Sequence, residues 1–166
     1  MKFSLSREAL LKPLQLVIGV VERRQTLPIL SNVLLSLSDK NLSITGTDLE
    51  VEIVGLTAVS DSEEEGSVTI SARKTLDICR SLPEGATLKF SSSEGKASIQ
   101  SGKSKFMLST LPASEFPTVD EGEKSLEFSV SGKDLQKLIE STSFAMAQQD
   151  VRYYLNGMLW ELTSGQ

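Results

Sequence analysis

The sequence predicts an α+β fold in which one unit, a strand followed by a helix and three strands, is repeated. Residues 3–37 match residues 128–162 at a constant offset of 125 positions without a gap. The same order of elements recurs at lower similarity within the first 120 residues. Because such repeats indicate copies of one domain, we expect pseudo-repeated units whose antiparallel sheets carry two helices packed on one face.

The first unit begins with a short strand at residues 2–5. Ser6 is suited to cap a helix, because its hydroxyl can accept a hydrogen bond from a free backbone N–H group of the first turn. Apolar residues then recur at helical spacing at Leu10, Leu14, Val17, Ile18 and Val21. Pro13 lies inside this helix and is expected to kink it or to weaken one backbone hydrogen bond. Polar turns separate three predicted strands at residues 32–39, 41–48 and 49–59.

The second unit repeats this order after residue 66. A strand at residues 67–71 leads into a helix that Ser71 caps and that ends before Pro83-Glu84-Gly85. Three strands follow at residues 86–92, 96–101 and 104–110. A third copy begins at Leu126 and is predicted to repeat the strand, the helix and the first strand after it.

The repeat predicts a complete first domain at residues 1–120, a linker at 121–125 and a truncated second domain at 126–166. The stretch at residues 111–125, which ends with this linker, contains two prolines, a glycine and several charged residues, a composition typical of extended chain. A piece near or below roughly 40 residues seldom buries enough apolar surface to offset its conformational entropy. We therefore expect residues 125–166 to be poorly ordered or to pack on a neighbouring molecule.

Groups suited to catalysis are scarce. The chain has no histidine and no glycine-rich phosphate loop, and its single Cys79 is expected to be a small buried side chain. Asp48, Glu50 and Glu52 are two residues apart, which places them on one face of a predicted strand. A magnesium or calcium site there is one interpretation, but a solvent-facing strand surface is favoured. We expect no catalytic residue, no metal site and no cofactor.

The net charge of −5 is unevenly distributed. Residues 61–66 carry four acidic groups, and residues 115–127 carry five against one lysine, so the remainder has 16 basic and 13 acidic residues, a balance of +3. An acidic rim with a basic face is compatible with DNA. No apolar run approaches the roughly 20 residues that span a bilayer, and no signal sequence precedes the first strand. We expect a cytoplasmic protein without a membrane partner.

Basic residues recur on the polar faces of the predicted helices. Arg73 and Arg80 lie seven residues apart on one face of the second helix. Lys12 and Lys137 occupy matching positions in the first and third helices, and Lys133 lies one turn before Lys137. Such cations contact phosphates without reading the base sequence. Ordinary solvated helix faces explain the pattern equally well.

The loops after the first and third helices add polar and aromatic groups. At the 125-residue offset Arg24 matches Gln149, so both copies place a long polar donor at the same point. Tyr153 and Tyr154 are suited to stack on bases while Arg152 meets a phosphate. Packing at the start of a strand is the alternative for the two tyrosines.

Five segments together resemble the bacterial DNA polymerase III beta subunit family, the sliding clamps: TLPILSNVLL, TGTDLE, ARKTLDICRSLPEGA, SGKSKFMLSTLPASEFP and AQQDVRYYLNGMLWE. The resemblance covers essentially all 166 residues and is to the N-terminal part of that family. It implies the DNA-clamp fold and a head-to-tail homodimeric ring of three-domain chains around double-stranded DNA. Helices would line the hole and strands would form the outer wall. The implied function is that of a non-catalytic processivity factor, which a clamp loader opens and which tethers DNA polymerase III and other clamp-binding proteins.

The resemblance also implies roles for individual residues. The implied DNA contacts are Arg24, Arg73, Gln149, Tyr153 and Tyr154. The implied head surface of the dimer interface comprises Lys74, Lys103, Lys105, Phe106 and Leu108. A buried strand face is the alternative for Phe106 and Leu108. Leu155 would border the peptide-docking groove.

The chain departs from the family by lacking most of the second domain and all of the third. We therefore expect that it does not close into a ring on its own. The alternative function is that of a truncated interaction module, which binds a clamp or a loader without encircling DNA.

Overall fold

A computed structural model describes residues 1–21, 27–118 and 127–163 of the chain. The chain divides into two units, Met1–Asp120 and Glu121–Gln166. Arg24, the predicted linker at 121–125 and the predicted strand start at Leu126 lie outside the described residues. In the described ranges no helix is both long and apolar enough to cross a membrane.

The first unit follows the predicted order of elements with one addition. Its helices and strands are β1 (Lys2–Ser6), α1 (Arg7–Val17), β2 (Asn32–Ser38), β3 (Asn41–Thr47), β4 (Glu52–Ala58), β5 (Asp61–Glu64), β6 (Gly66–Ser71), α2 (Ala72–Ser81), β7 (Thr87–Ser93), β8 (Lys96–Ser101) and β9 (Ser104–Leu111). Single 3-10 turns lie at Pro28–Ser31 and Ala113–Glu115.

Helix α1 begins at the predicted cap and buries its predicted apolar side. The Ser6 hydroxyl accepts a hydrogen bond from the Ala9 N–H group at 3.2 Å, which satisfies one free donor of the first turn. The helix runs through Pro13, which is buried together with Leu10, Leu14 and Val17. Pro13 lies directly against Gly55 of β4, where an added Cβ atom would come within 2.6 Å of the Pro13 Cβ atom. A glycine at this crossing therefore lets helix and strand approach closely.

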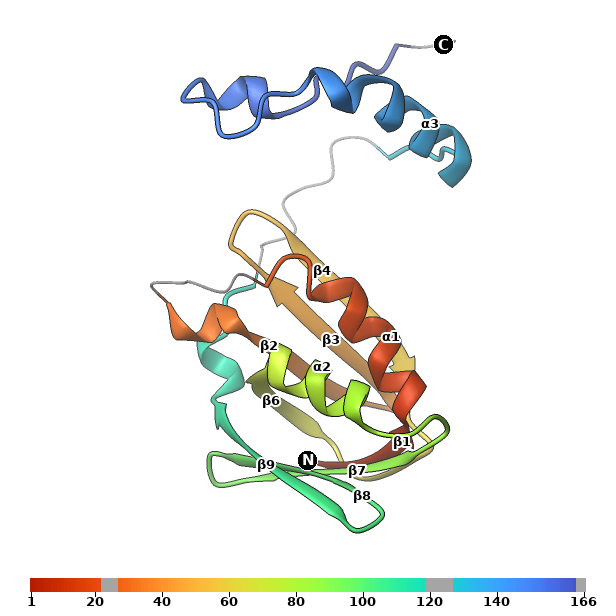
Figure 1. Cartoon of the computed structure of the whole chain (residues 1–166), viewed down its shortest axis with the longest axis vertical. Coiled ribbons are helices and arrows are strands. Elements are labelled where there is room, and N and C mark those ends of the chain that lie inside the picture. Colours follow the sequence, from red (N-terminus) through yellow and green to blue (C-terminus); the bar gives the residue numbers. More distant parts are fainter. Residues whose placement is uncertain (22–26, 119–126, 164–166) are drawn as a thin grey trace. The chain divides into compact units, whose positions relative to one another are not determined.

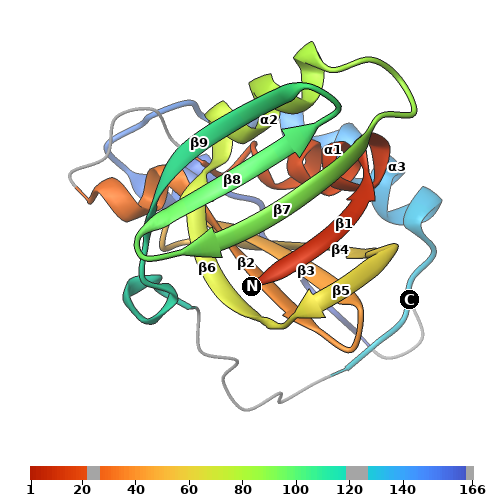
Figure 2. The same cartoon turned by 90° about the horizontal axis from the view of Figure 1, so that it is seen from below.

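The strands form one continuous antiparallel arrangement in the order β4-β3-β2-β6-β9-β8-β7-β1-β5. Helices α1 and α2 lie side by side on one face of the strands (Figure 1). Figure 2 shows β9, β8, β7, β1 and β5 in order across one curved layer. The core between helices and strands is apolar; its largest fully buried side chains include Leu5, Leu14, Leu35, Ile44, Ile70 and Ile99.

Strand β5 was not predicted, because the acidic segment at residues 61–66 was interpreted only through its charge, as part of an acidic rim. Residues Asp61–Glu64 pair with β1 in antiparallel register, although their side chains are largely exposed. Hydropathy does not show such a strand, because none of its side chains is apolar. β5 is an edge strand of the sheet, and its charged side chains favour contact with water over pairing with another chain.

The segment from Asp48 to Val51 is a second correction, because it forms a turn and not the start of a strand. The Asp48 carboxylate accepts hydrogen bonds from the backbone N–H groups of Glu50 and Val51 at 3.0 and 2.8 Å. These bonds lower the pKa of Asp48, the bond from Val51 most. Leu49 has a positive φ of 80°. Asp48, Glu50 and Glu52 therefore do not share one strand face.

The second unit contains one α-helix in its described part, α3 (Gly132–Thr142), and 3-10 turns at Ser143–Ala145 and Tyr153–Asn156. The expected strands on either side of α3 are absent from residues 127–163, which corrects the prediction. In the first unit the corresponding strands, β1 and β2, are paired on both sides by β5, β7, β3 and β6. Residues 127–163 contain no strand that could take the place of those partners, so the backbone groups have no ladder to join.

Candidate nucleic-acid interface

Helix α2 presents Arg73 and Lys74 in its first turn, directly after β6. Lys74 is exposed, whereas Arg73 is half-buried. The Nε atom of Arg73 is buried and makes no hydrogen bond within the described residues. A buried donor without a partner is unusual, because it has lost its water without gaining a bond. Arg73 therefore places a partly exposed positive charge on α2 while its Nε atom stays buried without a partner.

Further cations lie on the exposed sides of all three α-helices that the structure describes. Lys12 on α1 and Arg80 on α2 are exposed, as are Lys133 and Lys137 on α3. Helix α1 is joined to the end of α2 by Arg7, whose Nε atom donates to the Cys79 carbonyl at 2.7 Å. The same region buries the Cys79 thiol, and this burial raises its pKa to about 11 while Arg7 opposes the shift. Cys79 is thus a buried side chain with no thiolate at neutral pH.

The segment 147–156 of the second unit carries the polar and aromatic residues predicted there. Gln149 is exposed and has a positive φ of 59°. Tyr153 and Tyr154 are 82% and 66% exposed, and their rings meet edge to face with centroids 6.0 Å apart. The two tyrosines therefore do not pack at a strand start in this structure, and both offer a ring to solvent.

Arg152 differs from the prediction that its side chain is available for a phosphate. Its Nε and Nη2 atoms donate to the two carboxylate oxygens of Asp150, each at 3.0 Å. This pair lowers the pKa of Asp150 and raises the pKa of Arg152. The guanidinium fork is thus already occupied by a carboxylate of the same loop.

Strand β9 carries most of the predicted interface residues. Lys103 and Lys105 are exposed, Phe106 is half-buried against the core, and Leu108 is 8% exposed and belongs to the core. Leu108 thus contributes to the fold of the first unit before any partner is present.

One edge of β9 is largely open. Strand β8 pairs with β9 from Ser104 to Ser109, but β6 pairs with it only at Thr110 and Leu111. Backbone groups alternate in direction along a strand. Because the N–H group of Leu111 points to β6, those of Ser109, Met107 and Lys105 point the same way, where no described strand pairs with them.

Leu155 lies in the 3-10 turn at Tyr153–Asn156 and is 36% exposed. Its carbonyl accepts a hydrogen bond from the Ala147 N–H group at 3.0 Å. Its own N–H group donates to the Arg152 carbonyl at 2.9 Å. Leu155 therefore holds the base of the loop while part of its side chain remains accessible.

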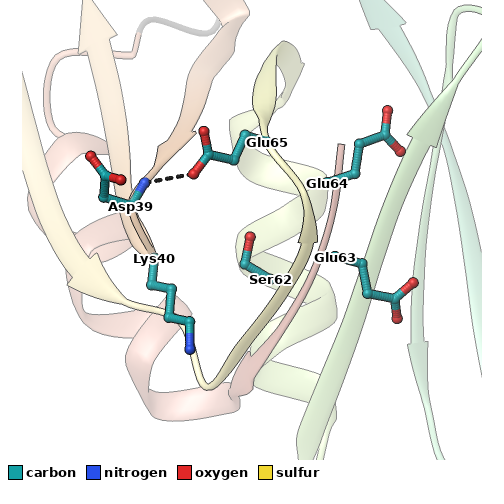
Figure 3. A pocket seen from close by; sticks show the side chains of 6 residues that line it. All are labelled: Asp39, Lys40, Ser62, Glu63, Glu64 and Glu65. Carbon is teal, nitrogen blue, oxygen red and sulfur yellow. Dashed lines mark hydrogen bonds between the residues drawn. The ribbon is translucent and has the colours of Figure 1, made fainter.

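A hollow of about 440 Å³ on the first unit is lined by six residues from β5, the position after it and the β2–β3 turn, four of them acidic: Asp39, Lys40, Ser62, Glu63, Glu64 and Glu65. Figure 3 shows the Glu65 carboxylate directed at the Asp39 N–H group, which donates to it at 2.7 Å, while Glu63 and Glu64 point away. The carboxylates do not converge on one point. In the described part of the chain no three acidic, cysteine or histidine side chains are grouped as metal ligands.

Sequence reasoning missed two polar groups that organise these surfaces. The buried Thr69 hydroxyl donates to the Leu111 carbonyl and accepts from the Leu111 N–H and the Asn32 side chain, which fixes the end of β9 on β6. The Asn156 side chain bonds both backbone groups of Asp150. No sequence motif predicts either residue, because the bonds join positions 42 and six residues apart, which no known local pattern links.

Two family models match the chain. The model described as the DNA polymerase III beta subunit, N-terminal domain, matches residues 1–120. The model described as the central domain of the same subunit matches residues 129–166.

Individual relatives agree with the family models. The chain is 59% identical over 165 residues to the beta sliding clamp of Pseudomonas aeruginosa, covering 99% of this chain and 45% of that protein. It is 51% identical over 166 residues to the beta sliding clamp of Escherichia coli K12, covering 100% of this chain and 45% of that protein. The chain thus spans less than half the length of these relatives.

Solved structures show the same similarity. A DNA polymerase sliding clamp from Pseudomonas aeruginosa with ligand superposes with a TM-score of 0.95 at 58% identity, covering 99% of this chain and 44% of that one. Caulobacter crescentus pol III beta superposes with a TM-score of 0.90 at 41% identity, covering 95% and 42%. The α+β architecture is therefore the clamp fold, and the chain belongs to the DNA polymerase III beta subunit family, the bacterial sliding clamps.

Proposed function

We propose that this chain supplies the first domain and the start of the second domain of a DNA sliding clamp subunit, a non-catalytic processivity factor of bacterial replication that acts in the cytoplasm. The domains are residues 1–120, a linker at 121–125, and 126–166. The observation that carries the proposal is the match of both family models in the order that the beta subunit requires. In its full-length form the protein would form a head-to-tail homodimeric ring around duplex DNA and tether DNA polymerase III, and a clamp loader would open the ring.

The DNA-contacting residues we propose are Arg24, Arg73, Gln149, Tyr153 and Tyr154. The exposed side of α2 supports this assignment, because the positively charged Arg73 is partly exposed in its first turn. Lys12 and Arg80 add exposed charge on the two adjacent helices. Contacts of this kind attract phosphates without reading bases, which permits sliding.

The dimer interface we propose uses the open edge of β9 and its flanking lysines: Lys74, Lys103, Lys105, Phe106 and Leu108. Free N–H and C=O groups at Lys105, Met107 and Ser109 suit the addition of a partner strand. Exposed lysines at the ends favour an acidic partner surface. Leu155, partly accessible at the base of its loop, would border the groove for clamp-binding peptides.

Duplex binding as a function of salt tests the DNA assignment. Arg73→Ala should weaken binding of the 166-residue chain equally for unrelated duplex sequences and reduce the salt slope by roughly one contact. Lys89→Ala is the matched control, since Lys89 is exposed on β7 between the inward-facing Leu88 and Phe90. Equal losses for the two variants, measured by fluorescence anisotropy, would contradict a DNA surface on α2.

The open β9 edge also favours the second candidate, an interaction module that binds a clamp or a loader without encircling DNA. Sedimentation of the chain mixed with a full-length beta sliding clamp separates the two functions. A mixed complex that Phe106→Asp abolishes, together with no salt-dependent DNA binding, would support the interaction module over the clamp function.

A further inference from the structure

The loop that presents Tyr153 and Tyr154 is closed by one side chain. The Asn156 Oδ1 atom accepts a hydrogen bond from the Asp150 N–H group at 3.0 Å. The Asn156 Nδ2 atom donates to the Asp150 carbonyl, also at 3.0 Å. Both backbone groups of Asp150 are therefore held by the amide of a residue six positions later.

This closure is coupled to the second set of bonds around Asp150. Its carboxylate accepts from the backbone N–H group of Arg152 at 2.8 Å and holds the Arg152 guanidinium through two further bonds. Asp150 is thus fixed through its backbone on one side and through its side chain on the other. Between the two ends of the loop, Tyr153 and Tyr154 are exposed, as is Val151.

We propose that Asn156 is a positioning residue, which closes the 150–156 loop and so holds the Tyr153 and Tyr154 rings in the orientation that meets nucleic acid. The inference rests on the proposed function of the two tyrosines as DNA contacts. Asn156 itself does not touch DNA in this proposal. By holding the loop in place beforehand, it reduces the conformational entropy that the two rings lose when they bind DNA.

The chemistry of the side chain explains why asparagine is needed here. The two bonds require one acceptor and one donor at the same short reach, which a carboxamide supplies. An aspartate keeps the acceptor but has no donor for the Asp150 carbonyl, and it would add a second negative charge to a loop that already holds the Asp150 carboxylate. A glutamine carries the same groups one methylene further from the backbone.

The experiment combines amide hydrogen exchange with DNA affinity, using the full 166-residue chain and a primer–template duplex with a single-stranded extension. The variants are Asn156→Ala, Asn156→Asp and Tyr153→Ala. The matched control is Gln136→Ala, which removes an exposed amide that bonds Glu140 one turn later on α3. A chain-wide exchange map shows at the same time whether α3 still forms.

For Asn156→Ala we expect exchange of the Asp150 amide to accelerate about tenfold, because its hydrogen bond is lost. Asn156→Asp should accelerate this exchange less, because an aspartate can still accept the bond from the Asp150 N–H group. Tyr153→Ala should leave this exchange unchanged but lower affinity for the duplex about fivefold. Asn156→Ala should lower affinity comparably, and Gln136→Ala should change neither measurement.

The readouts separate the inference from the function on which it rests. Unchanged Asp150 exchange in Asn156→Ala would overturn the loop closure, whatever happens to DNA binding. Faster exchange with wild-type affinity, while Tyr153→Ala still binds weakly, would overturn the positioning role and leave the tyrosines as DNA contacts. Wild-type affinity of Tyr153→Ala would instead overturn the function of the loop, and the positioning role with it.

Discussion

Helices α1 and α3 are two copies of one sequence pattern in different surroundings. Both are 11 residues long, and both begin after a serine whose hydroxyl accepts a bond in the first turn, Ser6 or Ser131. In α1 the apolar side is fully buried, with Leu14 at 0% exposure. In α3 no residue is buried, and Leu138 is 62% exposed. The capping of a helix is therefore set locally, whereas the burial of its apolar side depends on segments far along the chain.

The strands around the two helices differ even more. Strand β1 precedes α1 and is paired on both sides, by β5 and β7. Residues 127–130, the corresponding segment before α3, form no strand and are exposed. A helix satisfies its backbone within itself, but a strand does so only with a neighbour. The same sequence pattern thus retains its helix and loses its strands when partners are missing.

Core truncation should separate the two copies most strongly. Leu14→Ala in α1 should lower the free energy of unfolding of the first unit by about 3 kcal/mol, because it leaves a cavity in a closely packed core. Ile139→Ala, the matched change in α3, should alter it by less than about 0.5 kcal/mol. Urea denaturation followed by circular dichroism measures both. Similar losses would show that α3 is buried in solution.

A steric change at the α1–β4 crossing should have the next largest effect. Gly55→Ala places a Cβ atom 2.6 Å from the Pro13 Cβ atom, so the helix or the strand must move. We expect a loss of about 1–3 kcal/mol in unfolding free energy. Gly157→Ala in the second unit is the control, since no atom lies within 4 Å of its added Cβ. A wild-type denaturation midpoint for Gly55→Ala would disprove the close approach.

Removing the helix caps compares the two copies at the feature they share. Ser6→Ala should destabilise the first unit by about 1 kcal/mol, because the Ala9 N–H group loses its partner. Ser131→Ala should instead reduce the population of α3 without moving the unfolding midpoint of the first unit. Residue-resolved amide exchange next to thermal unfolding distinguishes these effects. Loss of global stability in Ser131→Ala would mean that the two units unfold together.

The smallest expected effect is on the response to acid. Hydrogen bonds from the Gly85 N–H group and from Arg7 lower the pKa of Glu8 below its ordinary value of 4.5. Since the folded-state pKa lies below the unfolded one, the stabilisation is present above the unfolded value and is lost as pH falls through the folded value. The pKa of Asp150 is lowered too, but by bonds within its own loop.

Glu8→Gln should therefore make the unfolding of the first unit less sensitive to pH below about 4.5, and Asp150→Asn should leave that sensitivity unchanged. Thermal unfolding over a pH series measures the difference. If the two variants show the same pH profile, the link from Glu8 to the turn after α2 does not contribute.

Much of the fold was predictable where the signal is local. The apolar spacing and the serine before each helix placed α1, α2 and α3 correctly, and most strands of the first unit agree within a few residues. The predicted capping bond of Ser71 was wrong, because its side chain makes no hydrogen bond in the first turn of α2. β5 was missed because its exposed side chains carry no hydropathy pattern. Asp48 was misread because its carboxylate bonds the backbone of its own turn, which a two-residue spacing does not reveal.

The candidate site was predictable in part. Residue type and helical spacing pointed to Arg73 on a polar helix face and to Tyr153 and Tyr154 in a loop. Its finer features were not predictable: the buried Nε atom of Arg73, the pairing of Arg152 with Asp150, and the Asn156 bonds. These depend on which groups meet in space.

The sequence by itself determined the repeat, the positions of the helices, the Ser6 cap of α1, and the family to which the chain belongs. These features follow from interactions between residues a few positions apart, or from similarity along the chain. Only the tertiary structure decided that Leu108 joins the core and that α3 remains exposed. It also decided that only the last two residues of β9 pair with β6, so that the rest of this edge stays open. The physical reason is that burial and strand pairing require partners that are distant in the sequence, so their presence or absence changes the outcome while the local pattern stays the same.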